Sequence, residues 1–520
     1  MTRGRVGWQA AIAGSLAAGL LALAVVPPLV QVAAGLLGSA GQLASLTAAR
    51  MWVLLGKSVL LAGAVTAIAT AAGLVLGVSF AKATFPGRRV LFAVHLLIAF
   101  LPPFLPALGW FRLVGRSGLF DSEMLSRVLF SGAGAVLVLA CCLTPLITAL
   151  TWIGLLSIDP SLEDAARVVA KPIRTVFGVL IPSASRAVAL GALVVFALAL
   201  SELGVPMFLR VDVYPAAVFS RLGGMDFAPG EAAVFMLPLL ATGLALFVVE
   251  HWWIGRKSLA LLGVRTGERS AVLRGRGRAI AAIAAAAGAM VSVAPLVGLA
   301  HHAICGRGWQ RLGQWAGDAP MNTLQAASAA AIVATAIAVV GGHAAARGQG
   351  LGRAMDALAT LSFLIPSTII GVGLIAAWNR PSTGWLYASF LILVIGYVAK
   401  YSIVASRTTE VVIAQMPVSL EEAGESVGAG YLRRLWGIVV RGNARGMLGA
   451  VTLAMVFCMR DLETAVLFYP PGGEPLTVRI FTLEANGPPA VVSALALLQV
   501  VMTGAALAAA ASLLARRRTA

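Results

Sequence analysis

The sequence predicts an all-α, polytopic membrane protein with about twelve transmembrane helices, arranged as two halves of six. Hydrophobic residues make up 59% of the chain and charged residues only 12%, whereas a soluble domain is about half apolar and about a quarter charged. Several continuous apolar runs are longer than the roughly 20 residues that a helix needs to cross the hydrocarbon layer. Because these runs do not alternate with polar residues, they favour helices over the strands of a membrane barrel.

Twelve predicted crossings follow one another along the chain. Their approximate bounds are 8–30, 52–80, 90–114, 131–153, 186–208 and 231–254 in the first half, and 279–303, 322–345, 354–378, 385–404, 447–469 and 489–514 in the second. An even number of crossings in each half preserves the orientation, so the halves form a parallel repeat. We expect a first half at 1–255, a basic cytoplasmic linker at 256–278 and a second half at 279–520.

The distribution of basic residues predicts which side of the membrane each loop faces. Most of the 39 lysines and arginines fall in segments that are cytoplasmic when the N-terminus is inside, as the positive-inside rule requires. Both termini are therefore expected in the cytoplasm. The formal net charge of +18 is then explained by orientation in the lipid bilayer, and we expect no nucleic-acid partner.

Two similar polar segments fall in predicted cytoplasmic loops of this otherwise apolar chain. SLEDAARVVA begins at Ser161 and SLEEAGESVG begins at Ser419. Each has the S-x-x-[DE] pattern of a capping box, so each is expected to start a short helix at its serine. Glu163 and Glu421 fall in the first turn, where a carboxylate complements the helix dipole. Two matched exposed helices indicate a partner with two equivalent sockets.

The two segments resemble the EAA loop of the permease subunits of ABC importers. The matching stretches are EDAARVVAKPIRTVFGVLIP at 163–182 and EEAGESVGAGYLRRLWGIVV at 421–440. The resemblance implies that the loops near 159–182 and 417–440 dock into ATPase subunits. The implied docking residues are Ser161, Leu162, Glu163, Asp164, Ala165, Ala166 and Ala170 in the first loop, and Ser419, Leu420, Glu421, Glu422, Ala423 and Gly428 in the second. Ala170 replaces the glycine of the motif, which Gly428 keeps, so we expect the two docking sites to differ.

The stretch RDLETAVLFYPPGGEPLTVRIFTLEANG at 460–487 is similar to the end of the fused permeases of ferric-iron and thiamine importers. The resemblance implies two type I importer permease halves in one chain of a bacterial inner membrane. It also implies two copies of an ABC ATPase and a periplasmic solute-binding protein as partners. ATP and Mg would be used by the ATPase, and this chain would bind no cofactor. Ferric iron is the first expectation for the cargo, with thiamine or another small solute as alternatives.

The residues that an enzyme would need are not found together in the sequence. Its G-K-[ST] sequence, at 56–58, lies in an apolar predicted helix and not in the Gly-rich loop that cradles phosphate. The five histidines are scattered and the four cysteines lack metal-ligand spacing. We therefore expect a transport subunit with no catalytic residues and assign no metal site. An ion-gradient-driven secondary transporter and a membrane-embedded enzyme are the alternatives, but neither requires paired cytoplasmic helices.

Acidic residues inside predicted crossings are candidates for the translocation path or for a gate. Such residues are rare, because a charged side chain costs roughly 2.5–3.5 kcal/mol at the centre of an inserted helix. Glu202 and Asp461 occupy equivalent positions of the two halves, and Glu463 follows closely. They would either attract a cation or brace a gate, with Arg460 as a partner, and the sequence leaves both readings open. The residues at 204–206 predict a broken helix end that lines a cavity.

Overall fold

The computed structural model describes residues 3–38, 49–223, 229–254 and 272–515. Within these ranges the elements are helices. The β-type pairing among the described residues is an isolated bridge between Ala83 and Leu273. Nine helices in the described ranges are long and apolar enough to span a membrane, or up to twelve when three bent pairs each count as one span. The predicted all-α polytopic membrane fold is therefore confirmed.

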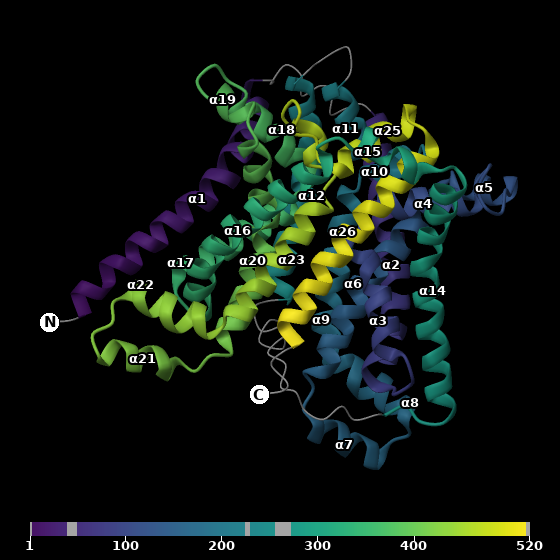
Figure 1. Cartoon of the computed structure of the whole chain (residues 1–520). Coiled ribbons are helices and arrows are strands. Elements are labelled where there is room, and N and C mark those ends of the chain that lie inside the picture. Colours follow the sequence, from purple (N-terminus) through teal and green to yellow (C-terminus); the bar gives the residue numbers. More distant parts are fainter. Residues whose placement is uncertain (1–2, 39–48, 224–228, 255–271, 516–520) are drawn as a thin grey trace. The chain divides into compact units, whose positions relative to one another are not determined.

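Helices of the first predicted half alternate between long spans and short connecting elements (Figure 1). They are α1 (Arg3–Gly38), α2 (Ala49–Lys82), α3 (Arg88–Leu97), η2 (Ile98–Phe100), α4 (Phe104–Val114), α5 (Glu123–Leu129), α6 (Gly132–Leu156), α7 (Pro160–Val169), α8 (Pro172–Thr175), η3 (Val176–Leu180), α9 (Ile181–Ser201), α10 (Gly204–Phe208), α11 (Tyr214–Gly223), α12 (Pro229–Val249) and η4 (Glu250–Ile254).

The second predicted half repeats this order with small differences. Its elements are α14 (Arg276–Cys305), η5 (Gly308–Arg311), α15 (Leu312–Ala316), α16 (Ala319–Ala346), α17 (Gly350–Leu364), α18 (Ser367–Trp378), α19 (Gly384–Tyr387), α20 (Leu391–Ala414), α21 (Val418–Ser426), α22 (Tyr431–Arg434), η6 (Leu435–Val440), α23 (Ala444–Met459), α24 (Ala465–Phe468), α25 (Leu476–Asn486) and α26 (Pro489–Ala515).

Each predicted crossing contains one of these helices or bent pairs, but several crossings are interrupted. The crossing at 90–114 bends by 109° between η2 and α4, and the crossing at 354–378 bends by 106° between α17 and α18. Prolines stand at both bends, where they remove a backbone donor and oppose a continuous helix. The crossings at 186–208 and 447–469 stop at Ser201 and Met459 and resume as the short helices α10 and α24.

The helices group into two compact units that differ from the two halves of the sequence. One unit contains residues 1–42, 317–479 and 501–520, and the other contains 43–316 and 480–500. In the first unit α1 packs against α16, α17 and α18, and in the second unit α14 packs against α2, α3 and α4 (Figure 1). The first helix of each predicted half thus groups with helices of the other half. The predicted halves, 1–255 and 279–520, stay a prediction about the sequence repeat. Of the predicted linker at 256–278, residues 256–271 lie outside the described residues.

Glycine residues bring these two first helices into backbone contact with their neighbours. A Cβ built on Gly109 of α4 would lie 2.2 Å from the carbonyl oxygen of Pro295 in α14. A Cβ built on Gly373 of α18 would lie 2.3 Å from the carbonyl oxygen of Pro28 in α1. Because a real side chain does not fit at either distance, glycine is required at both contacts.

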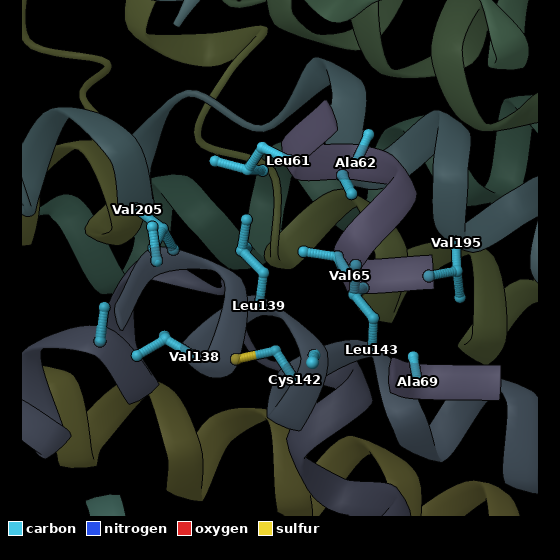
Figure 2. Packing of buried hydrophobic residues seen from close by; sticks show 14 of the residues in the cluster. Leu61, Ala62, Val65, Ala69, Val138, Leu139, Cys142, Leu143, Val195 and Val205 are labelled. Atoms are coloured by element: carbon cyan, nitrogen blue, oxygen red, sulfur yellow. The ribbon is translucent and has the colours of Figure 1, made fainter. Parts of the chain in front are cut away.

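The core of the unit that contains α2 is built from the apolar faces of α2, α6 and α9. Figure 2 shows Leu61 and Val65 of α2 near Leu139 and Leu143 of α6, with Val195 of α9 alongside. Cβ atoms on Gly73 and Gly77 would lie 2.5 Å from side-chain atoms of α6, so α2 and α6 pack closely. This packing places the last turn of α2, which ends at Lys82, against the loop that follows α6.

The other unit repeats the contact between α2 and α6 with α16 and α20. Gly77 of α2 faces Thr151 of α6, and Gly342 of α16 faces Thr409 of α20. This correspondence aligns α2 with α16 and α6 with α20. It also aligns Lys82 with Arg347, since each stands five residues after its glycine.

Candidate docking site: two short helices anchored by ion pairs

The predicted short helices are present as α7 and α21, but neither starts with the predicted capping box. In α7 the cap is Asp159, whose Oδ1 accepts hydrogen bonds from the N–H (2.9 Å) and the hydroxyl (2.8 Å) of Ser161. Pro160 occupies the first helical position, where its fixed φ favours the helix and its missing N–H costs nothing. The helix therefore starts one residue earlier than Ser161. The second helix, α21, starts after Pro417 without a side-chain cap, so the capping box predicted at Ser419 is also wrong.

The two helices end differently, as the substitution at position 170 predicts. Gly428 has φ +79°, and its N–H donates to the carbonyl of Glu425 while the N–H of Ala429 donates to that of Gly424. This is the Schellman arrangement, which favours glycine because a side chain opposes a left-handed backbone. Ala170 is extended instead, with φ −136°, and α7 ends at Val169.

Glu163 of α7 is anchored inside the protein by the end of α2. Its Oε2 accepts a hydrogen bond from Lys82 Nζ, and the two side chains are only 3% and 5% exposed. The backbone of this lysine is fixed as well, because its carbonyl accepts a 3.0 Å hydrogen bond from the N–H of Leu273. Glu163 therefore holds α7 against the membrane core and does not face outward.

Glu421 of α21 is anchored in the same manner by the end of α16. Arg347 donates to Oε1 through Nε (3.0 Å) and Nη2, and His343 Nε2 lies 2.7 Å from Oε2. Burial, the largest single influence, acts to raise the pKa of Glu421, but the hydrogen bonds from His343 and Arg347 outweigh it and the pKa lies below its ordinary value. Because this glutamate is charged at neutral pH, it forms a stable anchor.

Lys82 and Arg347 were missed by the sequence reasoning. A basic residue at the end of a crossing fits the positive-inside rule, so nothing marked these two as partners of the loops. The signal that would have found them is their equal spacing from Gly77 and Gly342, which becomes meaningful only once α2 and α16 are aligned.

The outward faces of α7 and α21 present apolar side chains at equivalent positions. Leu162 corresponds to Leu420, and both are about half exposed. Val169 corresponds to Val427, and both are 84% exposed. Of the other predicted docking residues, Ser161, Asp164, Ala165, Ser419, Glu422, Ala423 and Gly428 are exposed, Ala170 and Glu421 are partly buried, and Glu163 and Ala166 are buried. Exposed apolar residues rimmed by polar ones are typical of a protein-binding surface.

The charges around these apolar residues differ between the two loops. The first loop exposes Lys171 and Arg174, and its Asp164 is paired with Arg167 at 3.4 Å. The second loop exposes Glu422 and Glu425, and the latter is paired with Arg434 at 2.5 Å. Arg433 of the second loop is exposed as well. The first surface therefore has an excess of basic side chains and the second carries both signs, around a shared apolar pattern.

Glu202 and Asp461 lie in equivalent breaks, between α9 and α10 and between α23 and α24. Each is buried and caps the helix that follows, because Glu202 Oε1 accepts from Val205 N–H (3.2 Å) and Asp461 Oδ1 accepts from Thr464 N–H (2.8 Å). Asp461 Oδ2 also accepts from the Tyr401 hydroxyl at 2.8 Å. Both carboxylates thus stabilise broken helix ends, and a role in the translocation path stays a prediction.

Glu463, a candidate for the translocation path or a gate, and Arg460, a candidate partner, lie close to Asp461 in the sequence. Glu463 is partly buried, and the guanidinium of Arg460 lies 5.5 Å from the ring centroid of Phe457. In the part of the chain that the structure describes, no three His, Cys, Asp or Glu side chains are grouped to hold a metal ion. The structure therefore does not identify a cargo site at these residues.

A buried lysine in α20 was also missed by the sequence reasoning. Lys400 is 2% exposed, and its Nζ donates to the carbonyls of Phe363 (3.0 Å) and Ile365 (2.6 Å). These carbonyls belong to the bend between α17 and α18, where the helical hydrogen bonds are interrupted. A cation at a helix C-terminus is favoured by the helix dipole, so Lys400 stabilises the bend.

Comparison with characterised proteins relates the chain to transport proteins. No model of a known protein family matches it. It is 22% identical over 463 residues to the ferric transport system permease protein FbpB of Actinobacillus pleuropneumoniae, covering 83% of this chain and 67% of that protein. It is 30% identical over 193 residues to a probable molybdenum ABC transporter permease protein of Haloferax volcanii, covering 36% of this chain and 70% of the relative.

A shorter relative shows how the chain is organised. The molybdenum transport system permease protein ModB of Escherichia coli K12 is 27% identical over 219 residues, which cover 94% of that protein but only 39% of this chain. A nearly complete relative therefore matches less than half of this sequence. This agrees with the fusion of two such proteins in one polypeptide.

Proposed function

The chain belongs to the permease subunits of ABC transporters and carries two permease halves in one polypeptide, and on this premise we propose that it is the membrane-spanning subunit of an ATP-driven importer of ferric iron. It acts as a transport subunit and not as an enzyme. Two copies of a separate ABC ATPase bind α7 and α21 and hydrolyse ATP with Mg. A periplasmic binding protein delivers the cargo across the bacterial inner membrane, with both termini of the chain in the cytoplasm.

One observation carries this proposal: each docking helix is tied by its own glutamate to the end of a membrane helix. Lys82 ends α2 and Arg347 follows α16, so a force on α7 or α21 is passed directly to the two helices. When the ATPases close on binding ATP, they draw the two docking helices together, and α2 and α16 move with them. A flexible loop would absorb such a displacement, whereas a buried ion pair resists it.

The cargo is inferred from the names of the relatives. Those that match over most of the chain are named for ferric transport, and those that match about one half or less are named for molybdenum or 2-aminoethylphosphonate transport. Ferric iron is therefore favoured over thiamine and other small solutes. An ion-gradient-driven secondary transporter is disfavoured because it has no use for two anchored cytoplasmic helices.

The docking surface is tested at its matched valines. Val169→Asp and Val427→Asp each place a charge where an apolar contact is expected, without touching either ion pair. We expect each single variant to weaken co-purification of the ATPase and the double variant to abolish it. Phe120→Asp is the control, because Phe120 is also exposed and apolar but lies one predicted crossing away from the first docking loop. Full ATPase binding by the double variant would contradict the assignment of the surface.

Transport is tested in proteoliposomes that contain the permease, its ATPase and its binding protein. We expect uptake of radiolabelled ferric iron that requires hydrolysable ATP and persists when ionophores remove every ion gradient. Uptake that needs a gradient and no ATP would refute the ABC mechanism. Uptake of thiamine but not of iron would refute the cargo and leave the mechanism standing.

A further inference from the structure

The G-K-S sequence at 56–58 lies inside α2, so its lysine is not part of a phosphate-binding loop. Lys57 is instead exposed at the end of α2 remote from Lys82, about 37 Å away at the helical rise per residue. This distance exceeds the thickness of the hydrocarbon core, so the two lysines belong to opposite faces of the membrane. Lys57 therefore lies at the level of the lipid headgroups, on the side away from α7.

A groove of about 670 Å³ runs beside Lys57 between α2, α6 and the segment at 211–213. Its walls are apolar along most of its length and include Leu60, Ile68 and Leu137, which are 74%, 42% and 50% exposed. Leu61, which Figure 2 shows within the core cluster, also lines the groove. The volume is within the range of about 300–1,000 Å³ that is usual for small-molecule sites.

The polar side chains of the groove are gathered at one end. Asp212 belongs to the segment that is fixed beside Lys57, because the N–H of Tyr214 donates to the hydroxyl of Ser58 at 2.7 Å. Lys57 and Asp212 both line the groove and both are exposed. A cation and an anion at one end of an apolar groove match the shape and charge of a zwitterionic amphiphile.

The corresponding place in the other unit keeps the backbone arrangement but carries a different side chain. The hydroxyl of Thr323 accepts from the N–H of Leu476 at 2.7 Å, just as Ser58 accepts from Tyr214. The lysine, however, is replaced by Asn322, whose Nδ2 donates to the carbonyls of Gly472 (2.9 Å) and Glu474 (3.3 Å). The exposed lysine is thus particular to the first copy, whereas the equivalent of Asp212 in the second copy is Glu474, which is paired with Arg479 at 3.1 Å.

The small residues that start α6 also open the groove. Gly132 and Ala133 line it, and the alignment of Thr151 with Thr409 places Phe390 and Leu391 at their positions in the second copy. A Cβ on Gly132 would meet no atom within 4 Å, so the space beside it is free. The first copy therefore has small residues where the second carries larger ones.

We propose that this groove binds a phospholipid with an ethanolamine headgroup. The acyl chain lies along Leu60, Ile68 and Leu137, the phosphate pairs with Lys57, and the ammonium pairs with Asp212. A phosphatidylglycerol headgroup would satisfy the lysine but would leave the aspartate without a cation. The charge pattern thus selects the zwitterionic lipid over the anionic one.

Native mass spectrometry of the full-length chain in detergent, titrated with equal amounts of phosphatidylethanolamine and phosphatidylglycerol, tests the proposal. We expect the ethanolamine lipid to be retained preferentially, by up to about fivefold, the upper range for an exposed ion pair. Asp212→Asn should remove this preference, and Lys57→Gln should lower the binding of both lipids. Equal retention of both lipids by the unaltered chain, or a preference unchanged in Asp212→Asn, would overturn the proposal.

A filled groove provides the second test. Gly132→Phe introduces the residue that the second copy carries, and we expect it to displace the bound lipid. Val75→Phe places the same side chain at an exposed position of α2 outside the groove and should leave lipid binding unchanged. Retention of lipid by a folded Gly132→Phe, or equal loss in Val75→Phe, would show unspecific association and refute the site. Thermal unfolding checks that each variant is folded, and the two charge variants test the site if Gly132→Phe is not.

Discussion

Removal of the Glu163 carboxylate tests whether the ion pair with Lys82 couples α7 to the membrane core. Glu163→Ala leaves the lysine ammonium in a site where its side chain is 5% exposed and has lost its anionic partner. Breaking a buried ion pair by removing one partner typically costs about 3–5 kcal/mol. One carboxylate oxygen, Oε1, is buried and has no hydrogen-bond partner among the described residues, so we expect the lower part of that range.

This free-energy cost corresponds to a measurable rise in local opening of the loop that contains α7. A difference of about 3 kcal/mol corresponds to roughly a hundredfold rise in the population of the open loop, and amide hydrogen exchange reports such local opening. We expect exchange in α7 to accelerate by this factor, while exchange in α21 is unchanged. ATP hydrolysis by the assembled complex should continue while transport falls, because the docking helix no longer moves with α2.

A matched double variant separates this explanation from simple misfolding. Lys82→Met with Glu163→Leu removes both charges and keeps the volumes similar, and replacement of a buried pair by apolar residues of similar volume is often neutral. We expect it to restore slow exchange in α7. If Glu163→Ala leaves the exchange of α7 unchanged, or if the double variant exchanges as fast as the single one, the pair does not anchor the helix.

Three further predictions follow from the anchors, the glycine contacts and the caps. Because the pKa of Glu421 is lowered, its anchor is intact at neutral pH and is lost as the pH falls through that pKa. Hydrogen exchange in α21 should therefore rise below about pH 4.5, the ordinary pKa of glutamate. Glu421→Gln should remove this pH dependence. Gly109→Ala and Gly373→Ala should each lower stability to thermal unfolding by about 1–3 kcal/mol through overpacking, whereas Gly63→Ala, whose Cβ would meet no atom within 4 Å, should not. Asp461→Asn keeps a capping oxygen and should retain most transport, whereas Asp461→Ala should lose the helix cap at a cost in stability of about 0.5–2 kcal/mol. Equal loss of uptake in both variants would show that the charge itself acts on the cargo.

The membrane-spanning helices were predictable because their signal is long and local. An apolar run of sufficient length identifies a crossing whatever it packs against, and every predicted crossing has a helical counterpart. The bends at 101–103 and at 365–366 were not predicted, because a hydropathy window averages over them although proline marks both. The exchange of α1 and α14 between the units was not predictable either. It depends on backbone contacts of Gly109 and Gly373, and a glycine in an apolar run gives no sign of its partner.

The docking helices were predictable in position but not in orientation. The repeated polar segment located α7 and α21 and placed their glutamates in the first turn, as found. A single sequence does not tell which side of a short helix is buried, because that depends on residues far away in the chain. Lys82 is 81 positions from Glu163, and only the packing of α2 on α6 brings the two together. The inward direction of Glu163 therefore follows from the fold and not from the motif.

Under the proposed function, the differences between α7 and α21 restrict how two identical ATPase subunits would bind both. Lys171 and Arg174 of the first surface are exposed, and their equivalents in the second are uncharged. Glu425 of the second surface stands at the position of Arg167, so the charges around the two helices do not match. The features that the two surfaces share are apolar, namely the pairs Leu162 with Leu420 and Val169 with Val427. Contacts between exposed charges are screened within about 10 Å at 0.1 M salt, whereas apolar burial is not. If the two ATPase subunits are identical, they would hold the permease mainly through these apolar side chains, and we expect retention of the ATPase to vary little as salt is raised. A complex that dissociates at moderate salt would instead require two different ATPase subunits, each complementary to one loop.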